Sequence, residues 1–141
     1  MNKESKDVEL LLKMCAFKYY VKGNGAKFTL DQYKGKVGIL LDEFSEKAMD
    51  FGSAQIEEYR HALLSFMECL EGIRGSNKDL AMISLFVVWD RLDNQLYISK
   101  QKVARIVEND DYRSTILQGT AKRENIETRL GSVYEQLSKD D

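Results

Sequence analysis

The sequence predicts an all-α protein, a single compact bundle of about six to seven helices around a central apolar helix. The 141-residue chain contains no proline, and proline costs about 3 kcal/mol in a helix interior, whereas β-rich and loop-rich domains normally use several. Apolar residues recur at three- and four-residue spacing along most of the chain, which is the pattern of amphipathic helices. The stretch Leu80–Leu96 begins with three almost wholly apolar turns, as expected of a helix that is wrapped by others.

The bulk composition is that of a folded globular protein. The chain is 43% hydrophobic and 31% charged, with a formal net charge of −2, which argues against a dedicated nucleic-acid binder. Its length suits one domain, so we expect residues 1–141 to form a single helical domain. The charged N-terminus lacks the apolar segment of a signal peptide, and no apolar run approaches the roughly 18 residues that span a bilayer. We therefore expect a cytoplasmic protein with no membrane contact.

Apolar stripes predict two helices in the first third of the chain. The first runs from Lys6 to about Val21, and its apolar residues fall on more than one face, so it is expected to touch neighbours on two sides. The second stripe runs from Leu30 to Ala48 and contains Gly35 and Gly38. Either the helix starts after Gly38, or the glycines let another helix approach closely; we favour the close approach.

The third helix follows Ser53, a candidate N-cap, and ends between Gly72 and Gly75. His61 lies beside its apolar stripe and is expected at the surface, since no partner Cys, Ser or Asp motif accompanies it. The residues of the stripe are Ile56, Tyr59, Leu63, Phe66, Met67, Leu70 and Ile73.

The central helix is expected to start at Ser76–Asp79, whose S-x-x-D spacing resembles a capping box. Trp89 is predicted to be its largest buried side chain. Asp90, Arg91 and Asp93 mark where it emerges into water, and we interpret Asp90 and Asp93 as a solvated helix end rather than a metal site.

Three shorter helices are predicted in the C-terminal third. Ser99 caps the first, with Val103, Ile106 and Val107 inward and with Lys100, Lys102 and Arg105 outward. Asp110 and Asp111 open the second, where their charges suit the positive end of the helix dipole, and Gly119 fits its C-cap. Thr120 is expected to cap the last helix, whose inward residues are Ile126, Leu130, Val133, Tyr134 and Leu137.

No pattern of catalytic or ligand-binding residues is evident. The sequence lacks a P-loop, a dinucleotide-binding glycine motif, a nucleophile elbow and a zinc-protease motif. Cys15 and Cys69 have no CxxC spacing, so with one histidine there is no case for zinc, and both are expected to be small buried hydrophobes. We therefore predict no catalytic, cofactor-binding or metal-binding residue, and a chain that is not an enzyme by itself.

Two interpretations involve nucleic acid. The outward residues Lys100, Lys102 and Arg105 could contact DNA phosphates, because binding responds to local potential. The helix pair from Tyr112 to Leu137 could form a helix-turn-helix. We favour a third interpretation, that these are solvated faces of amphipathic helices.

The C-terminal segment resembles a known family. It combines an acidic-aromatic start at Asp110–Tyr112, the pair Gly119–Thr120, and a helix with Ile126 and Arg129. This pattern is similar to the end of the helical C-terminal half of GmrSD-type, ParB-related restriction proteins, and Asp7–Leu12 resembles the opening of that half. The resemblance implies that Tyr112, Gly119, Thr120 and Arg129 are structural: Thr120 as an N-cap hydroxyl, Arg129 as a guanidinium that bridges the last helices.

In that family, nucleotide hydrolysis belongs to an N-terminal ParB-like half, and DNA cleavage commonly belongs to an HNH-type partner. Neither the motif of the ParB-like half nor an HNH motif occurs in this sequence, so the family's catalytic residues have no positions here. We therefore expect a non-catalytic helical interaction module of a modification-dependent restriction system, acting through a nuclease or ParB-like partner. The alternatives are a helical module that binds the DNA backbone, and a stand-alone adaptor or immunity-type protein unrelated to restriction.

Overall fold

The computed structural model describes residues 3–23, 27–73, 75, 77–92 and 95–139. Over these residues the chain forms seven α-helices and no β-strand, which confirms the predicted all-α bundle. None of the described helices is both long and apolar enough to cross a membrane. The helices are α1 (Lys3–Tyr20), α2 (Val37–Ala48), α3 (Ser53–Cys69), α4 (Lys78–Arg91), α5 (Lys100–Glu108), α6 (Asp110–Leu117) and α7 (Arg123–Leu137).

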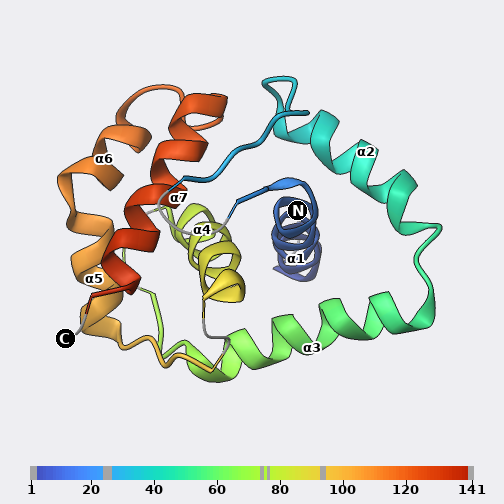
Figure 1. The fold of residues 1–141 in the computed structure, drawn as a ribbon, viewed down its shortest axis with the longest axis horizontal. Helices are drawn as coiled ribbons and strands as arrows, with labels where there is room; N and C mark the ends of the chain where they lie inside the picture. Colours follow the sequence, from blue (N-terminus) through green and yellow to red (C-terminus); the bar gives the residue numbers. More distant parts are fainter. Residues whose placement is uncertain (1–2, 24–26, 74, 76, 93–94, 140–141) are drawn as a thin grey trace.

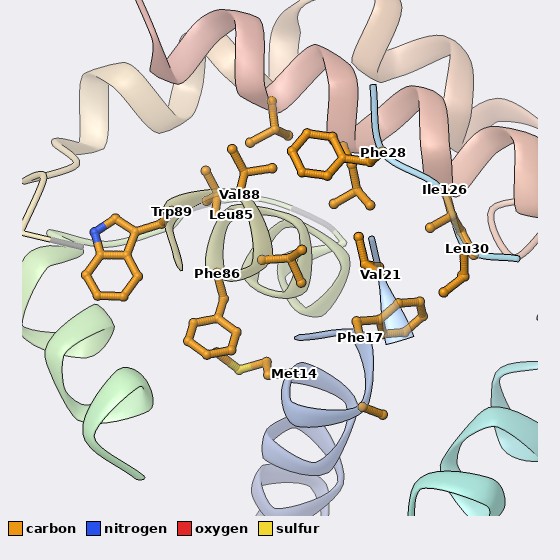
Figure 2. Packing of buried hydrophobic residues seen from close by; sticks show 14 of the residues in the cluster. Met14, Phe17, Val21, Phe28, Leu30, Leu85, Phe86, Val88, Trp89 and Ile126 are labelled. Atoms are coloured by element: carbon orange, nitrogen blue, oxygen red, sulfur yellow. The ribbon is translucent and has the colours of Figure 1, made fainter. Parts of the chain in front are cut away.

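Helix α4 lies at the centre of the bundle, as its sequence predicts. It packs against α1, α3 and α7 (Figure 1), and five consecutive residues of it, from Leu85 to Trp89, are buried. Phe86 and Met14 meet between α4 and α1, whereas Trp89 points away toward α3 (Figure 2). A helix buried on every side needs apolar residues all round, and this requirement explains why α4 has almost no polar face.

Helix α4 ends at Arg91, before the predicted end at Leu96. Leu92 leaves the helical conformation, with φ −91° and ψ −133°. The chain then returns across Trp89, whose indole Nε1 donates a hydrogen bond to the carbonyl of Leu96 at 2.9 Å. The buried indole nitrogen needs an acceptor, and the segment after α4 supplies it.

The predicted surface position of Asp90 and Arg91 is wrong, because both join α4 to the end of α1. The Asp90 carboxylate lies 2.7 Å from the ammonium of Lys18, and both side chains are mostly buried. Arg91 Nη2 donates to the carbonyl of Lys18 at 2.9 Å and to that of Val21 at 2.7 Å, which satisfies two acceptors at the C-terminus of α1. Asp93, and with it the Asp90–Asp93 pair, lies outside the described residues.

Helix α2 begins at Val37, so the favoured interpretation of a longer helix with closely approached glycines is wrong. Gly35 has φ +84°, a conformation that favours glycine, and it lies before the helix. A Cβ atom built on Gly35 or Gly38 would meet nothing within 4 Å. Both glycines face open space.

The segment before α2 is not helical and passes beside α7 (Figure 1), with a turn at residues 31–32. It buries Phe28, Leu30 and Tyr33 in the core, which accounts for the apolar residues that resembled a helical stripe. Hydrogen bonds from both sides hold it to the start of α7 and to the turn before that helix. The amide of Leu30 donates to Glu127 Oε2 at 2.7 Å, Tyr33 Oη donates to the carbonyl of Ala121 at 2.5 Å, and Arg123 Nη2 donates to the carbonyl of Tyr33 at 2.6 Å.

Helix α3 is shorter and less covered than predicted. Its N-cap is Gly52, not Ser53, with no side-chain cap hydrogen bond. It ends at Cys69 because Leu70 turns extended and forms a bridge with Ile98. Ile56 and Met67 of the predicted inward stripe are exposed, since α3 runs along the outer edge of the bundle (Figure 1). Ser76, the first residue of the predicted capping box, lies outside the described residues, but the N-cap of α4 is Asn77, with no side-chain cap hydrogen bond, so the predicted box is wrong.

Candidate functional site

The segment that carries the family resemblance folds as a closed corner of two helices. Helix α6 is capped by Asn109, whose Oδ1 accepts from the amide of Asp111 at 3.0 Å and from that of Tyr112 at 3.4 Å. Asp110 and Asp111 occupy its first turn, as predicted. After α6 ends at Leu117, Gly119 adopts φ +64°, the left-handed conformation typical of the residue that follows a helix.

Arg129 bridges this corner from inside, which is the role that the resemblance implied. The side chain is 2% exposed. Its Nε donates to Thr115 Oγ1 at 3.1 Å, and its Nη2 donates to the carbonyls of Thr115 at 3.1 Å and Thr120 at 2.9 Å. The guanidinium therefore joins the end of α6, the turn and α7.

Thr120 does not cap α7, so this prediction is wrong. The N-cap is Lys122, with no side-chain cap hydrogen bond, and the helix begins at Arg123. The amide of Lys122 donates to the carbonyl of Gly119 at 2.9 Å, so residues 119–122 form one extra turn before the helix. Thr120 instead contributes its carbonyl to Arg129.

Tyr112 is a buried residue of α6, 2% exposed. Its Oη has no hydrogen-bond partner among the described residues. Burial raises the pKa of this hydroxyl, and the nearby Arg129 opposes that rise. The ring thus fills space between the last helices, while the hydroxyl adds nothing to their cohesion.

The predicted basic face of α5 is not formed by its three residues. Lys102 is 7% exposed, and its ammonium donates to the carbonyl of Lys139 at 2.6 Å. Lys100 and Arg105 are exposed. The prediction failed at Lys102 because a lysine can bury its aliphatic stem while its ammonium reaches a backbone acceptor. The rest of this helix fits its sequence, since Ser99 Oγ accepts from the amide of Lys102 at 3.1 Å.

The structure brings together a site that the sequence interpretation missed, an apolar groove between α1, α2 and α3. Its volume is about 320 Å³. Val8, Leu11 and Ile56 form its rim and are 65%, 42% and 54% exposed. The described lining residues are all apolar or weakly polar: Val8, Leu11, Leu12, Cys15, Phe44, Ala48, Phe51, Ile56 and Tyr59.

The floor of the groove is a cluster of aromatic rings. Phe51 lies between Phe44 and Tyr59, with ring centroids 5.8 Å and 5.5 Å apart, and Tyr19 of α1 lies 5.6 Å from Phe44. Such contacts contribute about 0.5–1.5 kcal/mol per pair beyond area burial. The floor is therefore a packed surface. The ammonium of Lys18 lies 5.0 Å from the Tyr59 centroid and adds a cation–π contact at its edge.

The groove offers binding surface rather than reactive groups. Burial raises the pKa of the Cys15 thiol to about 11, with Lys18 opposing that rise, so the thiol is protonated at neutral pH and is a poor nucleophile. Desolvation likewise raises the pKa of Tyr59. His61 lies exposed on α3, as predicted. No group of His, Cys, Asp and Glu among the described residues has metal-binding geometry.

No protein-family model, curated protein or solved structure matches this chain. The likeness to GmrSD-type proteins therefore stays a prediction from the sequence. A signal for the groove was present in α1, whose residues Val8, Leu11, Leu12 and Cys15 follow the i, i+3, i+4, i+7 spacing of one helix face. A second face of α1 packs on α4, so sequence alone could not tell which of the two was open.

Proposed function

We propose that this chain is a non-catalytic interaction module that binds an amphipathic helix of another protein in the groove between α1, α2 and α3. The observation that carries the proposal is the exposed apolar rim of this groove. Val8, Leu11 and Ile56 expose their apolar side chains beside a floor of packed aromatic rings. A contiguous exposed apolar surface of this kind is typical of an interaction site.

The groove suits a helix because helices form its three sides. The seam of Val8, Leu11, Leu12 and Cys15 has the spacing that interdigitates with a second apolar stripe. Near the end of α2 and the start of α3, Ala48 and Ile56 face the same space. An incoming helix with apolar residues at i, i+3, i+4 and i+7 would complete a local bundle, which is a common mode of peptide recognition.

The family resemblance suggests the class of partner. A nuclease or ParB-like subunit of a restriction system would present such a helix, and in that arrangement nucleotide or DNA chemistry would be carried by the partner. Co-purification with the product of an adjacent gene tests this part of the proposal. The alternative that α5 binds the DNA backbone is weakened. The ammonium of Lys102, one of its three predicted phosphate contacts, is bonded to the carbonyl of Lys139.

A defined peptide tests the groove directly. The probe is a helical peptide with leucines at i, i+3, i+4 and i+7 on an alanine and glutamine background, compared with a scrambled peptide of the same composition. In a ¹⁵N NMR titration we expect amides of α1, α2 and the start of α3 to shift with the first peptide alone. Val8→Asp should weaken binding by roughly tenfold or more, because a charge then replaces an apolar contact.

Leu64→Asp is the matched control, since Leu64 is exposed on α3 and does not line the groove. Equal losses in Val8→Asp and Leu64→Asp, or equal binding of the scrambled peptide, would contradict the proposal. A dimer seen by sedimentation and abolished by Val8→Asp would mean that a second copy fills the groove. Duplex DNA binding at low salt that Lys100→Ala removes would favour the DNA alternative instead.

A further inference from the structure

A separate pocket lies between α1, α4 and α7, beside the turn at Thr120 and Ala121. Its volume is about 140 Å³, close to the roughly 150 Å³ of an apolar protein cavity that accepts benzene. The wall is mostly apolar, with Phe17, Leu80, Ile83, Val87, Ile126 and Leu130 contributing side chains. A compact hydrocarbon body fits such a space.

Arg129, whose side chain is buried, is one of the residues that line this pocket. Its Nε and Nη2 are bonded to Thr115 and Thr120, but no described residue accepts a hydrogen bond from Nη1. The described part of the chain also holds no carboxylate in an ion pair with Arg129. A buried cation without an anionic partner is costly, so an anion that reached Nη1 would be stabilised by both charge and hydrogen bonding.

A second donor belongs to Thr120, a lining residue that is bonded to Arg129 through its carbonyl, which lies 2.9 Å from Nη2. The Thr120 hydroxyl shares no hydrogen bond with any described residue, so it can donate to a ligand. Ser84 also lines the wall, but its hydroxyl already donates to the carbonyl of Leu80 at 2.9 Å.

The charges of the lining residues favour an anion. Lys13 and Arg129 are cationic and Asp79 is anionic among the described lining residues, but only Arg129 is buried, so its positive charge acts most strongly inside the pocket. Lys13 is partly compensated by Glu9, 3.2 Å away. Asp79 is exposed and would repel an anion from outside.

We propose that this pocket binds a small monocarboxylate with a compact apolar body, such as a short aliphatic or a simple aromatic acid. The carboxylate would accept hydrogen bonds from Arg129 Nη1 and the Thr120 hydroxyl, and the body would lie against Leu80, Ile83 and Val87. A phosphate or sulfate fits less well, because it would place several further oxygens against an apolar wall that cannot donate to them. The site is separate from the groove and does not depend on its function.

The test is an NMR titration of the full chain with sodium hexanoate and sodium benzoate, with 1-hexanol and inorganic phosphate as comparison probes. We expect saturable shifts at the amides of Thr120, Ala121 and Ile83 with the two carboxylates. Hexanol should bind roughly tenfold or more weakly, because it cannot form the charge-assisted hydrogen bond to Arg129. Phosphate should not displace the carboxylates.

Variants separate binding from folding. Arg129→Met should abolish the preference for hexanoate over hexanol, but it also removes bonds that hold the turn. Leu80→Trp therefore serves as a second variant: it fills the pocket from a half-buried position and should remove binding, whereas Leu64→Trp, on the outer side of α3, should not. Asp79→Asn should tighten carboxylate binding several-fold.

The proposal is overturned by any of three results: hexanol binding as tightly as hexanoate, phosphate competing for the site, or equal affinities in Leu80→Trp and Leu64→Trp. Absence of saturable shifts with either carboxylate at millimolar concentration would overturn it as well. Loss of binding in the groove variant Val8→Asp would show that the shifts come from the groove, and would also contradict the pocket assignment.

Discussion

At the scale of single residues, the cohesion of the C-terminal corner depends on buried polar groups that differ in how well they are satisfied. Arg129 is bonded by three hydrogen bonds to a threonine hydroxyl and two carbonyls, which offsets part of the desolvation of its charge. Burial lowers the pKa of Arg129. Tyr112, on the neighbouring helix, has a buried hydroxyl with no described partner. Removing the bonded guanidinium of Arg129 should therefore lower the free energy of unfolding, whereas removing the unpaired hydroxyl of Tyr112 should not.

Tyr112→Phe should leave the free energy of unfolding unchanged or raise it by up to about 1 kcal/mol, because the variant removes a buried, unpaired hydroxyl and keeps the ring. Tyr33→Phe is the matched control. The Tyr33 hydroxyl donates to the carbonyl of Ala121, so its loss should cost about 0.5–1.5 kcal/mol. Urea unfolding followed by circular dichroism measures both. A larger loss for Tyr112→Phe than for Tyr33→Phe would show that Oη has a partner in solution.

Cys15 should react slowly below pH 9. Burial raises its pKa from 9.0 to about 11, so the folded state favours the protonated thiol. The resulting contribution to stability is complete below pH 9 and declines as the pH rises through 11. Iodoacetamide labelling in a Cys69→Ser background should be slow at pH 8 and accelerate steadily toward pH 11. Rapid labelling at pH 8 would indicate an ionised thiol and would contradict the partial burial of Cys15 in the lining of the groove.

At the scale of helices, capping distinguishes two segments that looked alike in sequence. Ser99→Ala should cost about 1 kcal/mol, because Ser99 Oγ accepts from an amide in the first turn of α5. Thr120→Ala should change the free energy of unfolding by less than about 0.5 kcal/mol, since no cap hydrogen bond of α7 depends on that hydroxyl. Thermal or urea unfolding measures the pair. Equal losses would mean that Thr120 caps α7 in solution.

Sequence patterns located the helices better than their ends or exposed faces. The stretch that forms α4 could be recognised in the sequence because a helix that is apolar on all sides must be surrounded by other helices. Trp89 is fully buried, as predicted. The start of α2 was missed because Leu30 and Tyr33 are buried from a non-helical segment, and burial alone does not reveal conformation. Lys102 and Asp90 were misplaced because their partners, Lys139 and Lys18, are 37 and 72 residues away.

The groove shows the same limit at the level of helix faces. The i, i+3, i+4, i+7 stripe of α1 was visible in sequence, as were the stripes of α2 and α3. Whether a stripe is covered depends on how many helices reach it, and tertiary arrangement decides that number. Ile56 was expected inside for this reason and is exposed.

At the scale of the whole molecule, the bundle divides into an inner body and an outer arc. Helix α4 packs extensively on both α1 and α7, and α6 packs on α7. Helix α2 rests chiefly on α1, and α3 rests chiefly on α4, so the two form an arc around the far side of α1 (Figure 1). The aromatic cluster of Tyr19, Phe44, Phe51 and Tyr59 joins this arc to α1. The groove lies in the more lightly packed half.

Because regions with fewer buried contacts open at lower free energy, amides of α2 should exchange with solvent hydrogen at least roughly tenfold faster than those of α4 and α7 under native conditions. Phe44→Ala should widen this difference, since it removes the ring shared by α1, α2 and the turn before α3. Phe86→Ala, in the inner body, should instead accelerate exchange in every helix, because opening there requires global unfolding. Native-state hydrogen exchange with NMR detection distinguishes the two patterns. If Phe44→Ala accelerated α4 and α7 as much as α2, the bundle would unfold as one unit, and a helix docking into the groove would find a rigid surface rather than an adaptable one.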